Sequence, residues 1–139
     1  MISEAEVIPL LLTACPGFAP AWQEHLAWWK GDERGSYNDA AKFARYLVES
    51  YDRGETSEFS AAFAAIEKIL NEGDKNARDV VIVGVLEDLQ TIASHSCGGD
   101  VFVQWLGPTS RDAWAEIERA WAGKHSLMDV LRAERRGSQ

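Results

Sequence analysis

The chain has 139 residues, of which 46% are hydrophobic and 26% are charged, and its net charge is −8 at neutral pH. This length and composition are typical of one soluble domain, and no run reaches the roughly 18 apolar residues of a membrane-spanning helix. The acidic balance argues against direct binding to DNA or RNA, because affinity for nucleic acids comes largely from Lys and Arg that displace counterions.

The negative charge belongs to one part of the chain. Residues 1–100 hold 17 Asp and Glu against 8 Lys and Arg, whereas residues 101–139 hold 5 against 6. One interpretation is a solvated surface that keeps the protein soluble, and the other is a surface that attracts a basic protein. Composition does not separate the two interpretations, so both stay open.

The N-terminal segment has the pattern of a helix. Ser3 and Glu6 have the spacing of a capping box, and apolar residues follow at helical spacing as far as Ala14. Pro9 lies inside this pattern and predicts either a kink or a shifted start of the helix.

Residues 12–15 resemble the lipobox at which bacterial lipoproteins are cleaved and acylated at a cysteine. An export signal needs a basic region before its apolar core, and here Glu4 and Glu6 stand in that place. We therefore expect a cytoplasmic protein, in which Cys15 and Cys97 stay reduced.

The next predicted helix spans about residues 20–30 and carries two neighbouring tryptophans. Trp22, Leu26 and Trp29 fall on one stripe and are expected to face the core. Trp28 lies about 100° away from Trp29 around the helix. It either lines the edge of the core, which we favour, or stays half exposed as an anchor for a partner, since Trp is enriched at binding hot spots.

After a loop at 31–36, two amphipathic helices are predicted over residues 38–51 and 57–72. Both carry apolar residues on one face and charged residues on the other. Gly73 fits the left-handed position that often closes a helix.

Residues 79–95 are ambiguous, because their first half is β-branched and continuous enough to form a buried strand. No second strand is available to pair with it, and a lone strand is not stable. A buried helix is the better prediction, and Gly84 would let a neighbouring helix approach closely.

The last third begins with a glycine-containing loop at 96–100 and a short helical turn. Ser110 is then expected to cap a helix, and Ser126 with Asp129 to start a final one. The whole pattern predicts an all-α fold, an irregular bundle of seven or eight short helices. One domain would cover residues 1–135, followed by a frayed tail at 136–139.

Three ordered blocks carry a resemblance: HLAWWKGDERGSYNDAAKFARYLVESY, FAAIEKILNEGDKNARDVVIVGVLEDLQ and LGPTSRDAWAEIERAW. Together they resemble a family of small uncharacterised bacterial proteins, carried as a domain of unknown function, over about residues 5–122. The resemblance implies a compact α-helical cytosolic domain with no established catalytic residues. Small acidic helical proteins of this type are often suspected to be immunity partners of secreted toxins.

No group of residues predicts catalysis, a metal site or a cofactor. His95 and Cys97 are the most enzyme-like pair, but nearness along the chain supplies neither the lowered pKa nor the base that a catalytic cysteine needs. The three His and two Cys lack the paired spacing of zinc sites. We predict that the protein is not an enzyme, and a small enzyme that uses Cys97 and His95 is the alternative.

The favoured function is a protein-binding module for a basic partner. Its most concrete form is an immunity protein that neutralises a bacterial toxin by occluding the active site. A structural or adaptor domain is the other alternative without catalysis. The candidate contact surface combines one aromatic anchor with acidic residues: Trp28, Asp32, Glu33, Asp39, Glu72, Asp74, Asp79, Glu87 and Asp88.

Overall fold

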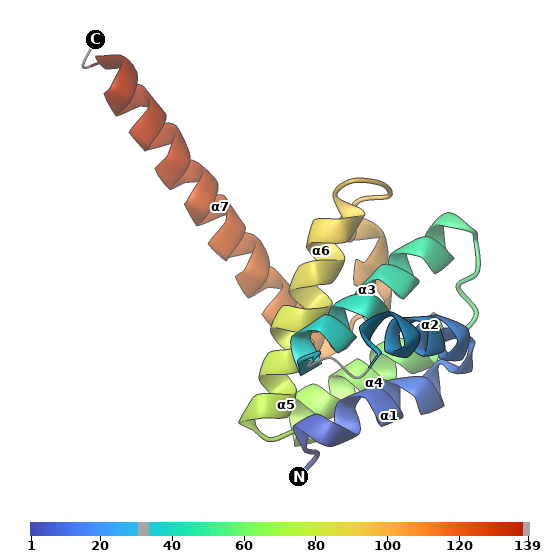
Figure 1. Cartoon of the computed structure of the whole chain (residues 1–139). Coiled ribbons are helices and arrows are strands. Elements are labelled where there is room, and N and C mark those ends of the chain that lie inside the picture. Colours follow the sequence, from blue (N-terminus) through green and yellow to red (C-terminus); the bar gives the residue numbers. More distant parts are fainter. Residues whose placement is uncertain (31–33, 138–139) are drawn as a thin grey trace.

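Helices account for almost all of the backbone in the computed structural model, which describes residues 1–30 and 34–137, with side chains described as far as residue 123. In this part of the chain, seven α-helices alternate with short 3₁₀ helices and one π-helix (Figure 1). The same residues contain no β-strand. The predicted all-α fold is therefore confirmed.

The first four elements build the N-terminal part of the bundle. They are η1 (Glu4–Glu6), α1 (Val7–Ala14), η2 (Pro16–Phe18) and α2 (Ala19–Trp29). The predicted capping box is present, and the Glu6 carboxylate accepts a hydrogen bond from the backbone N–H of Ser3 at 3.4 Å. Pro9 lies in the first turn of α1, where a missing N–H leaves no helical hydrogen bond unmade, so the α-helix starts later instead of kinking.

The N-terminal helices include the one pair of described segments whose combined length and hydropathy match a membrane span. No single described helix is long and apolar enough to cross a membrane. The segments Glu4–Ala14 and Pro16–Trp29 reach the required length and hydropathy only together, and they meet at an angle of 106°. In the structure they contribute Leu11 and Phe18 to the core, both fully buried.

The centre of the bundle is α3 (Ser36–Asp52), which packs across η3 (Val80–Glu87) and α6 (Asp88–Ala93) (Figure 1). Gly84 of the π-helix η3 makes this crossing possible, because a Cβ atom there would lie 2.6 Å from the Cβ of Ala40. The segment that also allowed a strand is helical, and the close approach predicted at Gly84 is confirmed.

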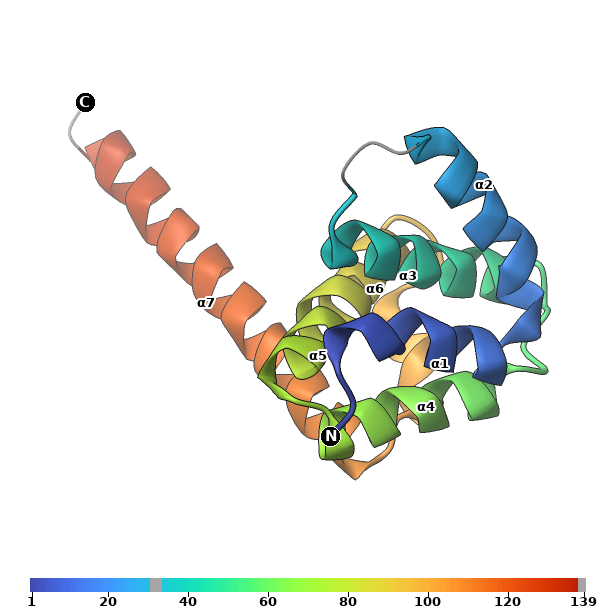
Figure 2. The ribbon, with the colours of Figure 1, turned by 60° about the horizontal axis from the view of Figure 1, so that its bottom comes forward.

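A second layer consists of α4 (Phe59–Glu72), which lies beside α1 (Figure 2), and the short α5 (Lys75–Asp79). Between α4, α3 and η4 (Gly99–Trp105) the core is filled mainly by phenylalanine. Phe59, Phe63 and Phe102 are fully buried there and contact one another in tilted or edge-on arrangements.

The left-handed conformation predicted for Gly73 is wrong. Its φ of −78° and ψ of 154° are extended, and Gly73 forms an isolated parallel bridge with Ile2. The backbone N–H of Ile2 donates to the carbonyl of Glu72 at 2.9 Å, and the N–H of Asp74 donates to the carbonyl of Ile2 at 2.8 Å. Pairing with the N-terminal segment, 71 residues away, therefore decides the conformation at the end of α4.

The two helix starts predicted near the C-terminus are also wrong. The helix begins at Pro108, not after Ser110, and it continues through Ser126 as α7 (Pro108–Gly137). Ser110 is buried in the first turn, where its hydroxyl donates to the carboxylate of Glu67 at 2.8 Å. A serine followed by an acidic residue can mark a helix start, but the same residues can also lie within a continuous helix, as they do in α7. The frayed tail at 136–139 stays a prediction.

The C-terminal half of α7 stands away from the bundle. In both views it extends into open space with no other element beside it, while its N-terminal half lies against the bundle (Figures 1 and 2). Trp114 and Ile117 in that first half are buried. The helix therefore leaves the bundle after the turn that contains Trp121, which is only partly buried.

Candidate functional site

Trp28 is the most exposed large hydrophobic residue apart from Met1 among the described residues, with 82% of its surface accessible. The placement at the edge of the core that we favoured is wrong, and the exposed alternative is correct. Trp29, its neighbour, is half-buried, as are Trp22 and Leu26. The helix turns its stripe of Trp22, Leu26 and Trp29 toward the bundle, and this leaves Trp28 in solvent.

Trp28 borders a recess of about 240 Å³ between α2, α3 and α6, which we call the tryptophan recess. Its lining residues are His25, Trp28, Trp29, Asn38, Ala41, Lys42, Arg45 and Ile92. Two indoles thus lie beside two cationic side chains from α3. A surface of this kind can hold an apolar or aromatic group together with an acceptor of hydrogen bonds from Lys or Arg.

A polar cluster that includes His25 of the recess joins α2 to α3. The Nε2 atom of His25 lies 2.8 Å from Oδ1 of Asp39, and the Nε–H of Arg34 donates to the same oxygen at 3.0 Å. His25 stacks on Trp22 with ring centroids 5.4 Å apart, and the guanidinium of Arg34 lies over that indole at 5.4 Å. Asp39 is therefore an internal ion-pair residue, with a side chain only 13% exposed.

Among the described residues, the other predicted acidic contacts do not line the tryptophan recess with Trp28. At the α4–α5 junction, Glu72 is exposed, while Asp74 accepts a hydrogen bond from the backbone N–H of Ala77 at 2.9 Å and so caps α5. Asp79 pairs with Lys75 at 2.9 Å. The predicted contacts Asp32 and Glu33 lie outside the described residues.

Glu87 and Asp88 lie at the junction of η3 and α6, and both are half-buried. Burial, and after it the neighbouring carboxylate of Glu87, raise the pKa of Asp88. Glu87 also lines a different depression, between η3 and α7. The predicted acidic residues that the structure describes therefore occupy at least two separate regions, and none of them lines the tryptophan recess.

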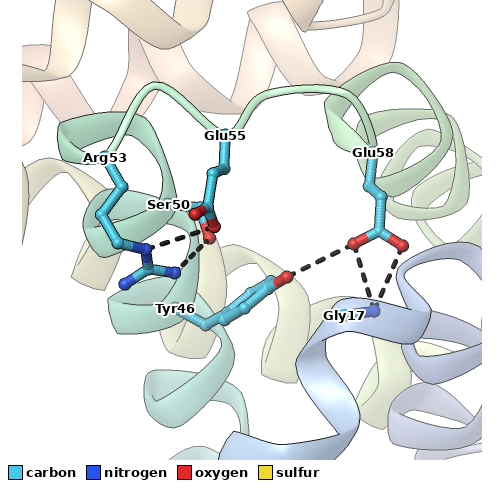
Figure 3. A network of polar contacts seen from close by, with 6 residues as sticks. All are labelled: Gly17, Tyr46, Ser50, Arg53, Glu55 and Glu58. Carbon is cyan, nitrogen blue, oxygen red and sulfur yellow. Dashed lines mark hydrogen bonds and ion pairs between the residues drawn. The ribbon is translucent and has the colours of Figure 1, made fainter.

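A second polar network joins η2, α3 and α4 (Figure 3). The carboxylate of Glu58 accepts hydrogen bonds from the backbone N–H of Gly17 at 3.1 and 3.2 Å and from the hydroxyl of Tyr46 at 3.3 Å. Burial, and then the Glu58 carboxylate, raise the pKa of the Cys15 thiol to about 12. A thiol with so high a pKa is inert near neutral pH, so this network fastens the chain and offers no nucleophile.

His95 and Cys97 lie in the turns that follow α6. His95 is exposed, Cys97 is half-buried, and no hydrogen bond joins them. Both cysteines are free thiols. Among the described residues, no group of three or more His, Cys, Asp or Glu is arranged to hold a metal ion.

Sequence reasoning missed the basic side of the recess. Asn38, Lys42 and Arg45 recur at helical spacing, and the sequence alone could have identified this polar face of the predicted helix at 38–51. It could not show that the face meets Trp28, because that contact depends on how α2 folds back onto α3.

The described residues form a small all-α domain with an exposed tryptophan beside a recess. The chain belongs to the family described as "Domain of unknown function (DUF7674)", whose model matches residues 8–122. This confirms the resemblance to an uncharacterised domain family. No curated protein and no solved structure matches the chain.

Proposed function

We propose that this chain is a protein-binding module whose contact surface centres on Trp28. The observation that carries the proposal is the 82% exposure of Trp28 beside a recess lined by Trp29, Lys42 and Arg45. Contact of an exposed indole with water is unfavourable in the free protein. Burial of the ring by a partner removes this contact and so favours binding. Trp and Arg are also the residues that most often dominate the free energy of binding at protein interfaces.

The rigid support beside Trp28 favours binding by a preformed surface. The His25–Asp39–Arg34 cluster and the stacked Trp22 join α2 to α3 next to the exposed ring. A contact residue on a fixed helix loses little conformational entropy when the partner binds. We therefore expect the recess to keep its shape in the complex.

The partner that we favour is a basic protein, and its most concrete form is a bacterial toxin that this chain neutralises by covering the active site. The net charge of −8 supports the choice of a basic partner, because it attracts cationic proteins over long distances. At the anchor itself, Lys42 and Arg45 favour a carboxylate or carbonyl group on the partner beside the apolar group that meets Trp28.

Replacing Trp28 with Ala tests the contact surface. A partner recovered with the wild-type chain as bait should bind the Trp28→Ala variant at least about thirtyfold more weakly, a loss of about 2 kcal/mol or more. The midpoint of thermal unfolding should change little, because the ring is exposed. Calorimetric titration and thermal unfolding measure the two quantities.

Tyr37→Ala is the matched control, since Tyr37 is an exposed aromatic residue of α3 outside the recess. This variant should bind like the wild type. Equal binding by wild type and Trp28→Ala would overturn the proposal, and so would equal losses in the two variants.

A further inference from the structure

The N-terminal half of α7 and the π-helix η3 enclose a groove of about 210 Å³, which we call the α7 groove. Its apolar lining comes from both elements, and two carboxylates border it: Ile82, Glu87, Ala113, Glu116, Ile117, Ala120 and Trp121. None of these residues lines the tryptophan recess. The groove is therefore a second surface, independent of the proposed function.

The groove ends where α7 leaves the bundle. The family match also ends there, at residue 122, while the helix continues to Gly137. At a rise of about 1.5 Å per residue, the remaining helix is roughly 20 Å long. In both views this half extends away from the bundle, and no other element lies beside it (Figures 1 and 2).

A helix of this length is marginal in water without packing, because most helical stability in proteins comes from burial of an apolar face. The sequence from residue 124 onward contains such apolar residues at short spacing, namely Leu127, Met128, Val130 and Leu131. It also holds 4 Lys and Arg against 2 Asp and Glu, in contrast to the acidic remainder of the chain. This half of α7 is thus apolar and basic.

The α7 groove has the complementary properties. Its floor is apolar, and Glu87 and Glu116 supply negative charge at its border. The basic residues available on the emerging helix are Lys124, Arg132, Arg135 and Arg136. Carboxylates at an apolar groove favour an apolar helix with Lys and Arg at its edges.

We propose that the α7 groove binds the C-terminal half of α7 from a second copy of this chain, so that two chains form an antiparallel dimer. Each copy has one groove and one emerging helix, so a twofold axis satisfies both contacts at once. The reciprocal insertion doubles the buried surface relative to one helix in one groove.

Charge-reversal substitutions in the groove and in the helix test whether the dimer forms as proposed. The groove variant carries Glu87→Lys and Glu116→Lys, and the helix variant carries Arg132→Glu, Arg135→Glu and Arg136→Glu. Sedimentation velocity at low ionic strength should give the wild type twice the monomer mass of 15.4 kDa. Each variant alone should dissociate at least about tenfold more readily, because like charges then face each other in both contacts.

Mixing the two variants should restore a dimer, because the Lys-bordered groove then meets the Glu-rich helix and the acidic groove meets the basic helix. Arg119→Glu is the matched control, since Arg119 is an exposed residue of α7 that does not line the groove. That variant should dimerise like the wild type. If the groove variant fails to fold, Glu116→Lys alone replaces it, because Glu116 is exposed.

A wild type that stays monomeric at every concentration would overturn the proposal. This includes the case in which the helix bends back into the groove of its own chain. Dimers that persist in the separate variants, or variants that do not combine on mixing, would overturn it as well.

Discussion

Glu67 fixes the start of α7 from a position in the middle of α4. Its carboxylate accepts hydrogen bonds from the backbone N–H of Thr109 and Ser110, at 3.0 and 2.8 Å, and from the Ser110 hydroxyl. Burial alone would raise the pKa of Glu67, but these hydrogen bonds outweigh it and lower the pKa to about 2. One side chain thus supplies the cap that the sequence around Ser110 was expected to provide by itself.

Replacing Glu67 with Gln should lower the free energy of unfolding at neutral pH by about 1 to 2 kcal/mol. The folded-state pKa lies below the ordinary value of 4.5. The stabilisation by Glu67 is therefore complete above about pH 4.5 and is lost as the pH falls toward 2. Urea unfolding at a series of pH values should show a smaller decline over this window in Glu67→Gln than in wild type.

Glu72→Gln is the control, because Glu72 is an exposed residue of the same helix whose side chain makes no hydrogen bond to any described residue. It should unfold like the wild type at neutral pH. A Glu67→Gln variant with the wild-type pH dependence would show that the carboxylate does not hold α7 in this way.

At the scale of the elements, the local sequence pattern predicted most of the helices. Contacts between elements determined the features that the pattern did not predict. The amphipathic pattern placed α3 and α4 within a few residues of their observed bounds. The conformation of Gly73 depends on Ile2, and the basic side of the tryptophan recess depends on the packing of α2 on α3. Local sequence patterns do not specify contacts with segments far away in the chain. For this reason the sequence analysis identified Trp28 as a candidate contact residue but did not identify Lys42 and Arg45.

The crossing of α3 over η3 can be tested at Gly84. Replacing Gly84 with Ala should lower the free energy of unfolding by about 1 to 3 kcal/mol, because the new methyl group collides with Ala40. The higher helix propensity of Ala offsets at most about 1 kcal/mol of this loss. Thermal and urea unfolding give the values.

Gly123→Ala is the matched control, because Gly123 is also a helical glycine and a Cβ there meets nothing within 4 Å. This substitution should leave stability unchanged or raise it by up to about 1 kcal/mol. Two glycines replaced in the same way should thus shift stability in opposite directions. A stabilised Gly84→Ala variant would mean that the helices can separate at little cost.

At the scale of the whole molecule, the described acidic residues are dispersed and do not gather in one contact surface. We expect their charge to act on a partner over long distances more than by direct contact. Asp39 forms an ion pair with Arg34, Asp74 caps α5, and Glu87 borders the α7 groove. None of these three side chains lies in the tryptophan recess. A dispersed charge of −8 changes how fast a charged partner arrives, whereas close contacts set how long it stays.

The association rate with a basic partner should therefore fall as salt rises to physiological ionic strength, where the screening length is about 8 Å. Changing Asp32, Glu33 and Glu72 to Lys should slow association further, with little effect on dissociation. Asp74 is left unchanged, because its side chain caps α5. Stopped-flow measurements at several salt concentrations give the association and dissociation rates. An association rate that does not change with salt concentration would refute the long-range electrostatic effect.

The bridge between Ile2 and Gly73 has a practical consequence for observing this protein. Met1 is 97% exposed, while Ile2, the next residue, is nearly buried and hydrogen-bonded to the end of α4. A fluorophore attached to the first residue would therefore not move freely as a label on a loose terminus does. A fall in its anisotropy would report the opening of the Ile2–Gly73 bridge at the α4–α5 junction.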